Sequence, residues 1–433
     1  MSLSNLIDLW VSLVPGLFLL GLAGLARFKL RSWLSPGPFF GLVWGALLLL
    51  PTLITPEYYI SLFSMWLIVL ASSAVILGDI LAQTFWPGSR TITNHHSQDE
   101  ASLTLLRSTL VLACLCGVFA AMALLATKGY GFGVFLSLGS LTSVGREFAM
   151  ARYQDDFTAP LLARLGMAGL YFAALLAGML FASSRQRTDR LLALAPMAPA
   201  LAYGAVLTSR SPVLYTMIFW LSSYFTTLIV LTQGKARLFT TLNIIRGTAV
   251  GILVLLMFIS FQMSRYGWLS ASDLIFILFK LRVWFFGYLA GFSQWLAQAP
   301  TLLGDLHYGS YTFAGLFSLL GISARELGIY SQHLAISDLA ESTNVYTLFR
   351  GLLEDFGLAG MLVFLFCSGF GCGAAYSRLK YGRLGFASVL VCFFSVTLWS
   401  HVTCLLNYNS IILALLIYAL FLNFRHRLQE VAP

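Results

Sequence analysis

Long apolar runs separated by short polar connections dominate the chain. Each run has about 17 to 24 residues, the length that a helix needs to cross roughly 30 Å of hydrocarbon. The pattern predicts eleven membrane-spanning helices, at 8–26, 38–54, 59–81, 107–126, 160–183, 191–207, 213–232, 247–263, 357–377, 385–400 and 409–424. We therefore expect an all-α, polytopic membrane protein that forms a single integral membrane domain over residues 1–433.

Composition agrees with this reading. Apolar residues make up 59% of the chain and charged residues 10%, whereas a soluble domain carries about 25% charged residues. A soluble fold of this size has too little interior for so many apolar side chains. The six cysteines fall in or beside apolar runs without metal-ligand spacing, so we interpret them as packing residues and expect no bound metal and no cofactor.

The distribution of basic residues predicts the orientation. If the N-terminus lies outside, every second connection is cytoplasmic, and these connections hold 16 of the 26 basic residues: Arg27, Lys29, Arg31, Arg90, Arg107, Arg185, Arg187, Arg190, Lys235, Arg237, Arg246, Arg378, Lys380, Arg383, Arg425 and Arg427. Short basic connections are typical of the cytoplasmic side. The formal charge of +9 is thereby explained and does not indicate nucleic-acid binding.

Two segments on the outer side are long, at about 127–160 and 264–356. A structureless loop of the second length would be unusual, so we expect it to carry short amphipathic helices. Residues 273–298 are apolar enough to span a membrane, but Lys280 and Arg282 interrupt them, and a crossing here would invert all later connections. We interpret this segment as an amphipathic or re-entrant helix on the outer leaflet.

Arginines at the outer rim are the main candidates for chemistry, because the guanidinium group binds phosphate through two parallel hydrogen bonds. Arg210 lies in the very short turn 208–212, where a phosphate-binding role and a membrane anchor are equally consistent. Arg282 lies in an aromatic helix and is open to the same two readings. Arg265 follows a span, and a membrane anchor is the simpler interpretation for it. Arg325 lies beside Glu326, and a local ion pair is the simpler interpretation there.

Other candidate residues are acidic, imidazole or glycine. His307 and His333 are predicted to lie outside and titrate near neutral pH. Asp355 stands directly before a span, where it would either cap the helix or act on a substrate. Gly369, Gly371 and Gly373 lie inside a span, which favours close helix packing over nucleotide binding.

Several short motifs resemble the Wzy-type oligosaccharide repeat-unit polymerases of O-antigen and enterobacterial common antigen. The motifs are Asn344-Val-Tyr-Thr-Leu-Phe349, Asp355-Phe-Gly357 with Gly360, Gly309-Ser-Tyr-Thr-Phe313, the Thr208-Ser-Arg210 turn, Arg265-Tyr-Gly267 and the Arg282 helix. The resemblance covers roughly residues 200–377. The first 200 residues agree only in hydropathy.

The resemblance implies a GT-C-like glycosyltransferase of the bacterial inner membrane with a periplasmic active site. It would transfer a glycan from undecaprenyl pyrophosphate to a lipid-linked repeat unit. Arg210 and Arg282, then Arg325 and Arg265, would stabilise the leaving pyrophosphate without a metal. The general base would be His333, Asp355 or Glu354, and Asn344, Tyr346, Thr347 and Tyr311 would contact sugar. A separate co-polymerase would set chain length.

Two alternatives stay open. The related O-antigen ligases share this layout but transfer the glycan to lipid A core, and the motifs at 344–347 and 355–357 favour a polymerase over them. A non-enzymatic flippase of lipid-linked oligosaccharides would need a hydrophilic cavity through both leaflets, and the predicted spans offer few polar side chains to line one.

Overall fold

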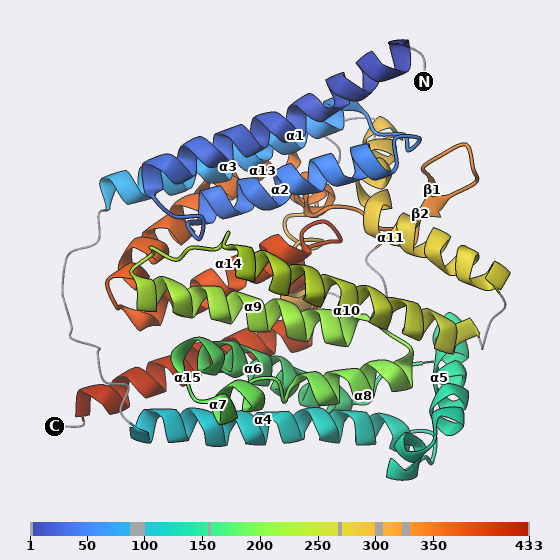
Figure 1. Cartoon of the computed structure of the whole chain (residues 1–433), viewed down its shortest axis with the longest axis vertical. Coiled ribbons are helices and arrows are strands. Elements are labelled where there is room, and N and C mark those ends of the chain that lie inside the picture. The colour runs from blue at the N-terminus through green and yellow to red at the C-terminus, as the bar shows by residue number, and fades with distance from the viewer. Residues whose placement is uncertain are drawn as a thin grey trace. The chain divides into compact units, whose positions relative to one another are not determined.

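Helices make up nearly all of the protein (Figure 1), whose computed structural model describes residues 3–86, 100–154, 157–266, 271–298, 306–322 and 330–431. The α-helices are α1 Leu3–Leu30, α2 Pro36–Ile54, α3 Leu62–Phe85, α4 Glu100–Ala126, α5 Leu138–Tyr153, α6 Leu161–Ser183, α7 Arg187–Leu192, α8 Met197–Leu207, α9 Ser211–Thr232, α10 Thr241–Tyr266, α11 Ala271–Gln298, α12 Ala314–Leu319, α13 Leu348–Lys380, α14 Ala387–Trp399 and α15 Asn409–Val431. Three short 3₁₀ helices are η1 Phe132–Leu136, η2 Leu384–Phe386 and η3 Leu405–Asn407.

The prediction of a polytopic membrane protein is confirmed at this level. Within the described ranges, ten helical segments are long and apolar enough to cross a membrane: Leu9–Leu30, Pro36–Ile54, Leu62–Phe85, Ser102–Ala126, Leu161–Ser183, Arg187–Leu207, Ser211–Thr232, Thr241–Met263, Leu274–Gln298 and Leu348–Lys380. Nine of them coincide with predicted spans. The remaining predicted spans, 385–400 and 409–424, are the shorter apolar helices Leu384–Trp399 and Asn409–Arg425.

The tenth long segment belongs to α11, which the sequence analysis places on the outer leaflet. It forms one continuous helix with Lys280 and Arg282 near its middle. By length and apolar content it meets the same criterion as the spans. The interpretation as an interfacial helix rests on the charge pattern of the later connections and stays a prediction.

The long predicted outer segments contain elements of their own. Residues 127–160 hold η1 and α5, and residues 264–356 hold α11, α12 and a small hairpin. The hairpin pairs β1 (Leu334–Ala335) antiparallel to β2 (Ser342–Thr343), with Leu334 opposite Thr343. These two-residue strands are the departure from an all-α structure in the part of the chain that is described.

The chain divides into two compact units, each assembled from segments far apart in sequence. Unit 1 comprises Met1–Thr93, Ile229–Ala236 and Arg282–Ile412. Unit 2 comprises Asn94–Leu228, Arg237–Leu281 and Leu413–Pro433. The long loop that carries most of the candidate residues belongs largely to unit 1.

In unit 1, α1, α2, α3 and α13 pack side by side (Figure 1). Glycine allows the closest approach, between α3 and α13. A Cβ atom on Gly78 would lie 2.2 Å from the carbonyl oxygen of Phe366, and one on Gly369 would lie 2.2 Å from that of Val75. Gly371, two residues on, faces open space. The expected packing role therefore holds for Gly369 and not for Gly371.

A buried carboxylate fastens α2 to α3 at one end of unit 1. Asp79 accepts hydrogen bonds from the Ser35 hydroxyl (2.7 Å), the Gly37 backbone N–H (2.8 Å) and the Gln83 amide (2.7 Å). Gly37 lies in the first turn of α2, whose N–H groups have no partner within the helix. The carboxylate supplies that partner and thereby fixes where α2 begins.

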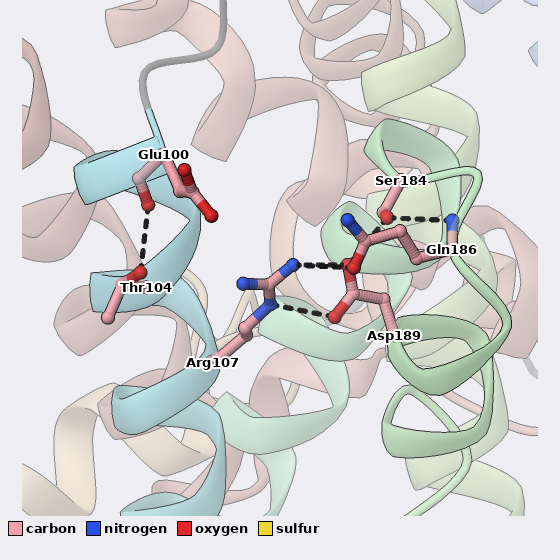
Figure 2. A network of polar contacts seen from close by, with 6 residues as sticks. All are labelled: Glu100, Thr104, Arg107, Ser184, Gln186 and Asp189. Atoms are coloured by element: carbon pink, nitrogen blue, oxygen red, sulfur yellow. Dashed lines mark hydrogen bonds and ion pairs between the residues drawn. The ribbon is translucent and has the colours of Figure 1, made fainter.

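In unit 2, α4 packs along α6 and α8, and an ion pair fixes one of its ends. Figure 2 shows Arg107 of α4 donating two hydrogen bonds to Asp189 of α7, at 2.7 and 2.8 Å. Ser184 donates to the same carboxylate at 2.5 Å, and Gln186 accepts a bond from Arg107 at 3.2 Å. Because Asp189 is buried, this two-point pairing compensates a charge that would otherwise be costly.

Candidate functional site

Polar and aromatic side chains gather at one end of unit 1, which we call the hairpin end. It is formed by the connections 55–61, 306–313, 330–347 and 400–408. Backbone hydrogen bonds join them: Tyr59 N–H to Ile336 (2.8 Å), His307 N–H to Glu354 (3.1 Å) and Leu348 N–H to Ser400 (2.7 Å). Most of the predicted site residues lie here.

A break in α13 organises this end. Gly357 has φ 64° and ψ −177°, which interrupts the helix and suits glycine because a side chain disfavours positive φ. The carbonyl of Asp355 accepts a bond from the Tyr308 backbone N–H at 3.0 Å. The Asp355 carboxylate accepts bonds from the N–H groups of Tyr311 (3.1 Å) and Thr312 (2.6 Å). Asp355 therefore anchors the 307–312 segment instead of capping the next helix, and both of its oxygens have partners.

Arg350, about two turns before the break, lies within a cage of aromatic rings. Its guanidinium carbon is 3.7 Å from the ring centre of Tyr330, 4.1 Å from that of Tyr346 and 5.1 Å from that of Trp295. Only 8% of its side chain is exposed. A cation over an aromatic face is stabilised more strongly when it is removed from water, so this cage fixes Arg350 in one position.

Glu354 lies one turn further along and is held at both oxygens. It accepts a bond from Arg350 Nε at 3.0 Å and one from the Tyr330 hydroxyl at 2.9 Å. Burial, followed by the nearby charge of Glu354, raises the pKa of the Tyr330 phenol well above its ordinary value. The phenol therefore stays protonated and available as a donor, and 17% of the Glu354 side chain remains exposed.

The loop from Tyr330 to Tyr346 is fastened at its stem. The Tyr346 hydroxyl donates to the Gln332 carbonyl at 2.8 Å, and the Asn344 amide lies 3.5 Å from the Tyr330 carbonyl. Thr347 is buried and precedes α13 as its N-cap without a side-chain capping bond. The predicted sugar contacts Asn344, Tyr346 and Thr347 thus belong to one structural unit with Arg350.

The tip of the same loop meets Arg282. This guanidinium pairs with Glu57 and, at 3.7 Å, with Glu341, and it lies 5.4 Å from the ring centre of Tyr58. The Glu341 side chain is fully buried and also accepts a bond from the Tyr58 hydroxyl at 3.1 Å. Carboxylates therefore compensate the charge of Arg282 here, while a third of its side chain (33%) is exposed.

The part of α11 after Arg282 contacts three other helices. The Tyr288 hydroxyl donates to the Leu47 carbonyl of α2 at 2.5 Å. Ser293 lies 2.6 Å from the Ser64 hydroxyl of α3, and Trp295 covers Arg350 at the start of α13.

Three histidines lie at the hairpin end in different surroundings. His333 and His307 are exposed, and the His307 ring packs edge-on against Tyr311 at 4.9 Å. His401 lies between the rings of Tyr288 and Trp399. Burial lowers the pKa of His401 to about 4, so its imidazole is neutral near pH 7.

Two other predicted arginines belong to unit 2. Arg210 follows the left-handed Thr208 (φ 46°), and its guanidinium lies 4.8 Å from the ring centre of Phe258. Arg152 of α5 donates to the carbonyl of Leu207 and thereby supports this turn. Arg265 falls in the last turn of α10, but its side chain is outside the described part of the structure, and Arg325 lies outside the described residues.

The centre of this cluster was not predicted from the sequence: Arg350, Tyr330 and Trp295 are not among the predicted site residues. The spacing of Arg350 and Glu354 at i and i+4 is a readable signal for an ion pair on one helix face. The aromatic cage cannot be predicted in this way, because Trp295 of α11 and Tyr330 lie 55 and 20 residues earlier in the chain.

No protein-family model, no curated protein and no solved structure matches the chain. Within the described ranges, no group of three or more His, Cys, Asp or Glu side chains is arranged to hold a metal ion.

Proposed function

We propose that this protein is a GT-C-like membrane glycosyltransferase that polymerises undecaprenyl-pyrophosphate-linked oligosaccharide repeat units at the periplasmic face of the bacterial inner membrane. One observation carries the proposal. The motifs 309–313, 344–349 and 355–357, which resemble the polymerases, meet in one network through the Asp355 carboxylate and the Arg350 cage. Segments that form a site together are expected to converge in this way, whereas chance similarities in unrelated loops are not.

The proposed chemistry needs fixed cations. As the glycosidic bond to phosphate breaks, the leaving pyrophosphate gains negative charge, and prearranged donors stabilise it. Arg282 and Arg210 are proposed for this role, with Arg325 and Arg265 next. The Arg282 side chain is one-third exposed, and its guanidinium is flanked by Glu57 and Glu341, so a phosphate would compete with these carboxylates for the same donors.

Sugar recognition is assigned to the rim around Arg350. Asn344 and Tyr311 offer an exposed amide and a partly exposed ring and hydroxyl, which suit a ligand with both hydroxyls and apolar C–H faces. Tyr346 and Thr347 are buried, so they would support these contacts from within and would not touch the sugar. The substrates are two undecaprenyl-linked glycans in the bilayer, and a separate co-polymerase is proposed to set chain length.

The test is polymerisation by purified protein on a lipid-linked repeat unit, with and without EDTA. We compare wild type with Arg210→Ala and Arg282→Ala, and use Arg164→Ala, an exposed outer-rim arginine outside the proposed site, as the matched control. We expect a product ladder that is insensitive to EDTA and unchanged in the control. Loss of one such donor is expected to lower turnover by about 10² to 10³.

Four outcomes would contradict parts of the proposal. A wild type that makes no ladder from the authentic substrate would exclude the polymerase. Transfer to lipid A core would identify a ligase, and translocation across vesicles without chain growth would identify a flippase. A ladder that persists in both folded variants would return Arg210 and Arg282 to the role of membrane anchors.

A further inference from the structure

We infer that Glu354 is the catalytic base of the site, which accepts the proton of the attacking sugar hydroxyl, and that Arg350 is the residue that positions it. This inference rests on the proposed glycosyl transfer. The sequence leaves His333, Asp355 and Glu354 as alternatives, and the geometry separates the two carboxylates.

The carboxylates of the hairpin end differ in what holds them. Asp355 is fully buried with both oxygens bonded to backbone N–H groups. Glu341 is buried and bonded to Tyr58 and Ser337, and Asp338 is bonded to the Tyr59 hydroxyl. Each Glu354 oxygen likewise has one donor among the described residues. Glu354 differs from Asp355 and Glu341 in exposure, because 17% of its side chain is exposed whereas the other two residues are buried. A substrate hydroxyl can therefore reach Glu354 but not Asp355 or Glu341.

Fixed donors give Glu354 the properties that a base requires. A base must be ionised and must lie within hydrogen-bond distance of the proton that it removes. Burial raises the pKa of Glu354 above its ordinary value, and the Arg350 guanidinium opposes this rise because it favours the ionised form. The aromatic cage holds Arg350 in this position. The Tyr330 hydroxyl fixes the second oxygen, so the carboxylate plane has one orientation. Because Arg350 is almost fully covered, it acts through Glu354 and not on substrate.

An aromatic wall beside Glu354 would hold the acceptor. The Tyr311 and Tyr330 rings are nearly parallel, with an interplanar angle of 12° and centroids 5.9 Å apart, and His307 packs edge-on against Tyr311. Both tyrosines are partly exposed. Among the described residues, the charged or titratable groups that face Glu354 are Arg350, Tyr330, Tyr346 and His307, and Asp355, the next residue in the chain, faces Tyr330.

The step balances without a further reagent. The acceptor hydroxyl oxygen forms a bond to the anomeric carbon of the donor glycan, and its proton passes to the Glu354 carboxylate. The bond from the anomeric carbon to the phosphate oxygen breaks, and its electron pair leaves with undecaprenyl pyrophosphate. The proton is then released from Glu354 to solvent, which restores the ionised base.

The experiment measures kcat and KM for wild type, Glu354→Gln, Glu354→Ala and Arg350→Lys. Glu147→Gln, an exposed carboxylate of α5 paired with Lys128, serves as the matched control. Loss of a general base lowers turnover by about 10² to 10⁴, so we expect that loss in kcat for both Glu354 variants. Added formate should restore turnover in Glu354→Ala, where the space is open, and not in Glu354→Gln.

Arg350→Lys separates positioning from folding. Lysine keeps the charge but is not planar and cannot fill the cage in the same way. We expect a lower kcat with KM for the acceptor little changed, and an acid limb of the pH profile moved to higher pH, because the carboxylate is held in its ionised form less firmly. A merely structural Arg350 would lower the yield of folded protein and leave the pH profile in place.

The outcomes distinguish this inference from the proposed function. A wild type without product defeats the polymerase itself. An active wild type with a Glu354→Gln variant that keeps its kcat overturns the assignment of the base and leaves the polymerase standing. Loss of kcat in Glu354→Gln at unchanged melting temperature, together with formate rescue of Glu354→Ala, supports it. If Glu354→Ala fails to fold, Glu354→Gln alone decides.

Discussion

Helix packing in unit 1 should depend on single glycines, and the chain supplies its own control. Gly369→Ala places a methyl group 2.2 Å from the Val75 carbonyl oxygen of α3, whereas the methyl group of Gly371→Ala meets nothing within 4 Å. Both positions lie on α13, two residues apart. The two variants therefore make the same chemical change in the same helix and differ only in what the new carbon contacts.

The structure sets the size of the effect. A carbon and a carbonyl oxygen approach to about 3.3 Å, so at Gly369 the helices must separate by roughly 1 Å. Overpacking of this kind costs about 1 to 3 kcal/mol of stability. A gain in stability of up to about 1 kcal/mol partly offsets this cost, because alanine has a higher helix propensity than glycine. At Gly371 the new methyl group meets no neighbour within 4 Å, so only the gain in helix propensity applies. Because the gain is common to both variants, we expect Gly369→Ala to be less stable than Gly371→Ala by the overpacking cost, about 1 to 3 kcal/mol.

The assay is the apparent melting temperature in detergent, followed by the loss of monodisperse protein on size-exclusion chromatography at one heating rate. Gly369→Ala should melt below wild type, and Gly371→Ala at or above it. Gly78→Ala, whose methyl group would meet the Phe366 carbonyl at 2.2 Å, should behave like Gly369→Ala. Equal melting temperatures for the Gly369 and Gly371 variants would refute the close contact between α3 and α13.

Two further predictions concern charged and titratable groups. Arg107→Leu removes the cation that pairs with the buried Asp189, so the melting temperature of this variant should fall. Arg187→Gln, at an exposed arginine, is the control and should melt like wild type. Equal melting temperatures for the two variants would exclude a stabilising ion pair. His401 has a folded-state pKa of about 4 against an ordinary value near 6.5, so the unfolded chain binds more protons between these values. Stability should therefore be fully present above pH 6.5 and fall by roughly 2 to 3 kcal/mol as the pH drops toward 4. The measurement is the melting temperature of wild type and of His401→Phe as a function of pH, and the difference between the two curves isolates the contribution of His401. Parallel curves would contradict a stabilising effect of the neutral imidazole.

Sequence patterning predicted the helical, polytopic class because span length and apolar content are local properties. A run of 17 or more apolar residues must satisfy its backbone as a helix in a bilayer wherever it lies in the fold. The same argument located nine of the ten long apolar segments. It was weakest at α11, where Lys280 and Arg282 interrupt an apolar run and local pattern alone does not choose between a span and an interfacial helix.

Close helix contacts depended on tertiary structure. Sequence predicted packing roles for Gly369, Gly371 and Gly373 alike, because all three lie in one span. The facing atoms of α3 decide the matter: Gly369 meets a backbone carbonyl, Gly373 meets Asp79, and Gly371 meets nothing. Side-chain identity on one helix carries no information about which neighbour occupies the opposite position.

The candidate site shows the same division. By themselves, the residues predicted an outer rim rich in arginine and a set of short motifs between 309 and 357, since charge and motif spacing can be read along the chain. Only the fold brought Trp295, Tyr330 and Tyr346 around Arg350, and only the break at Gly357 turned Asp355 toward the 307–312 backbone. Contacts between residues tens of positions apart depend on how the loops return to the helix ends, and that path is set by packing rather than by local pattern.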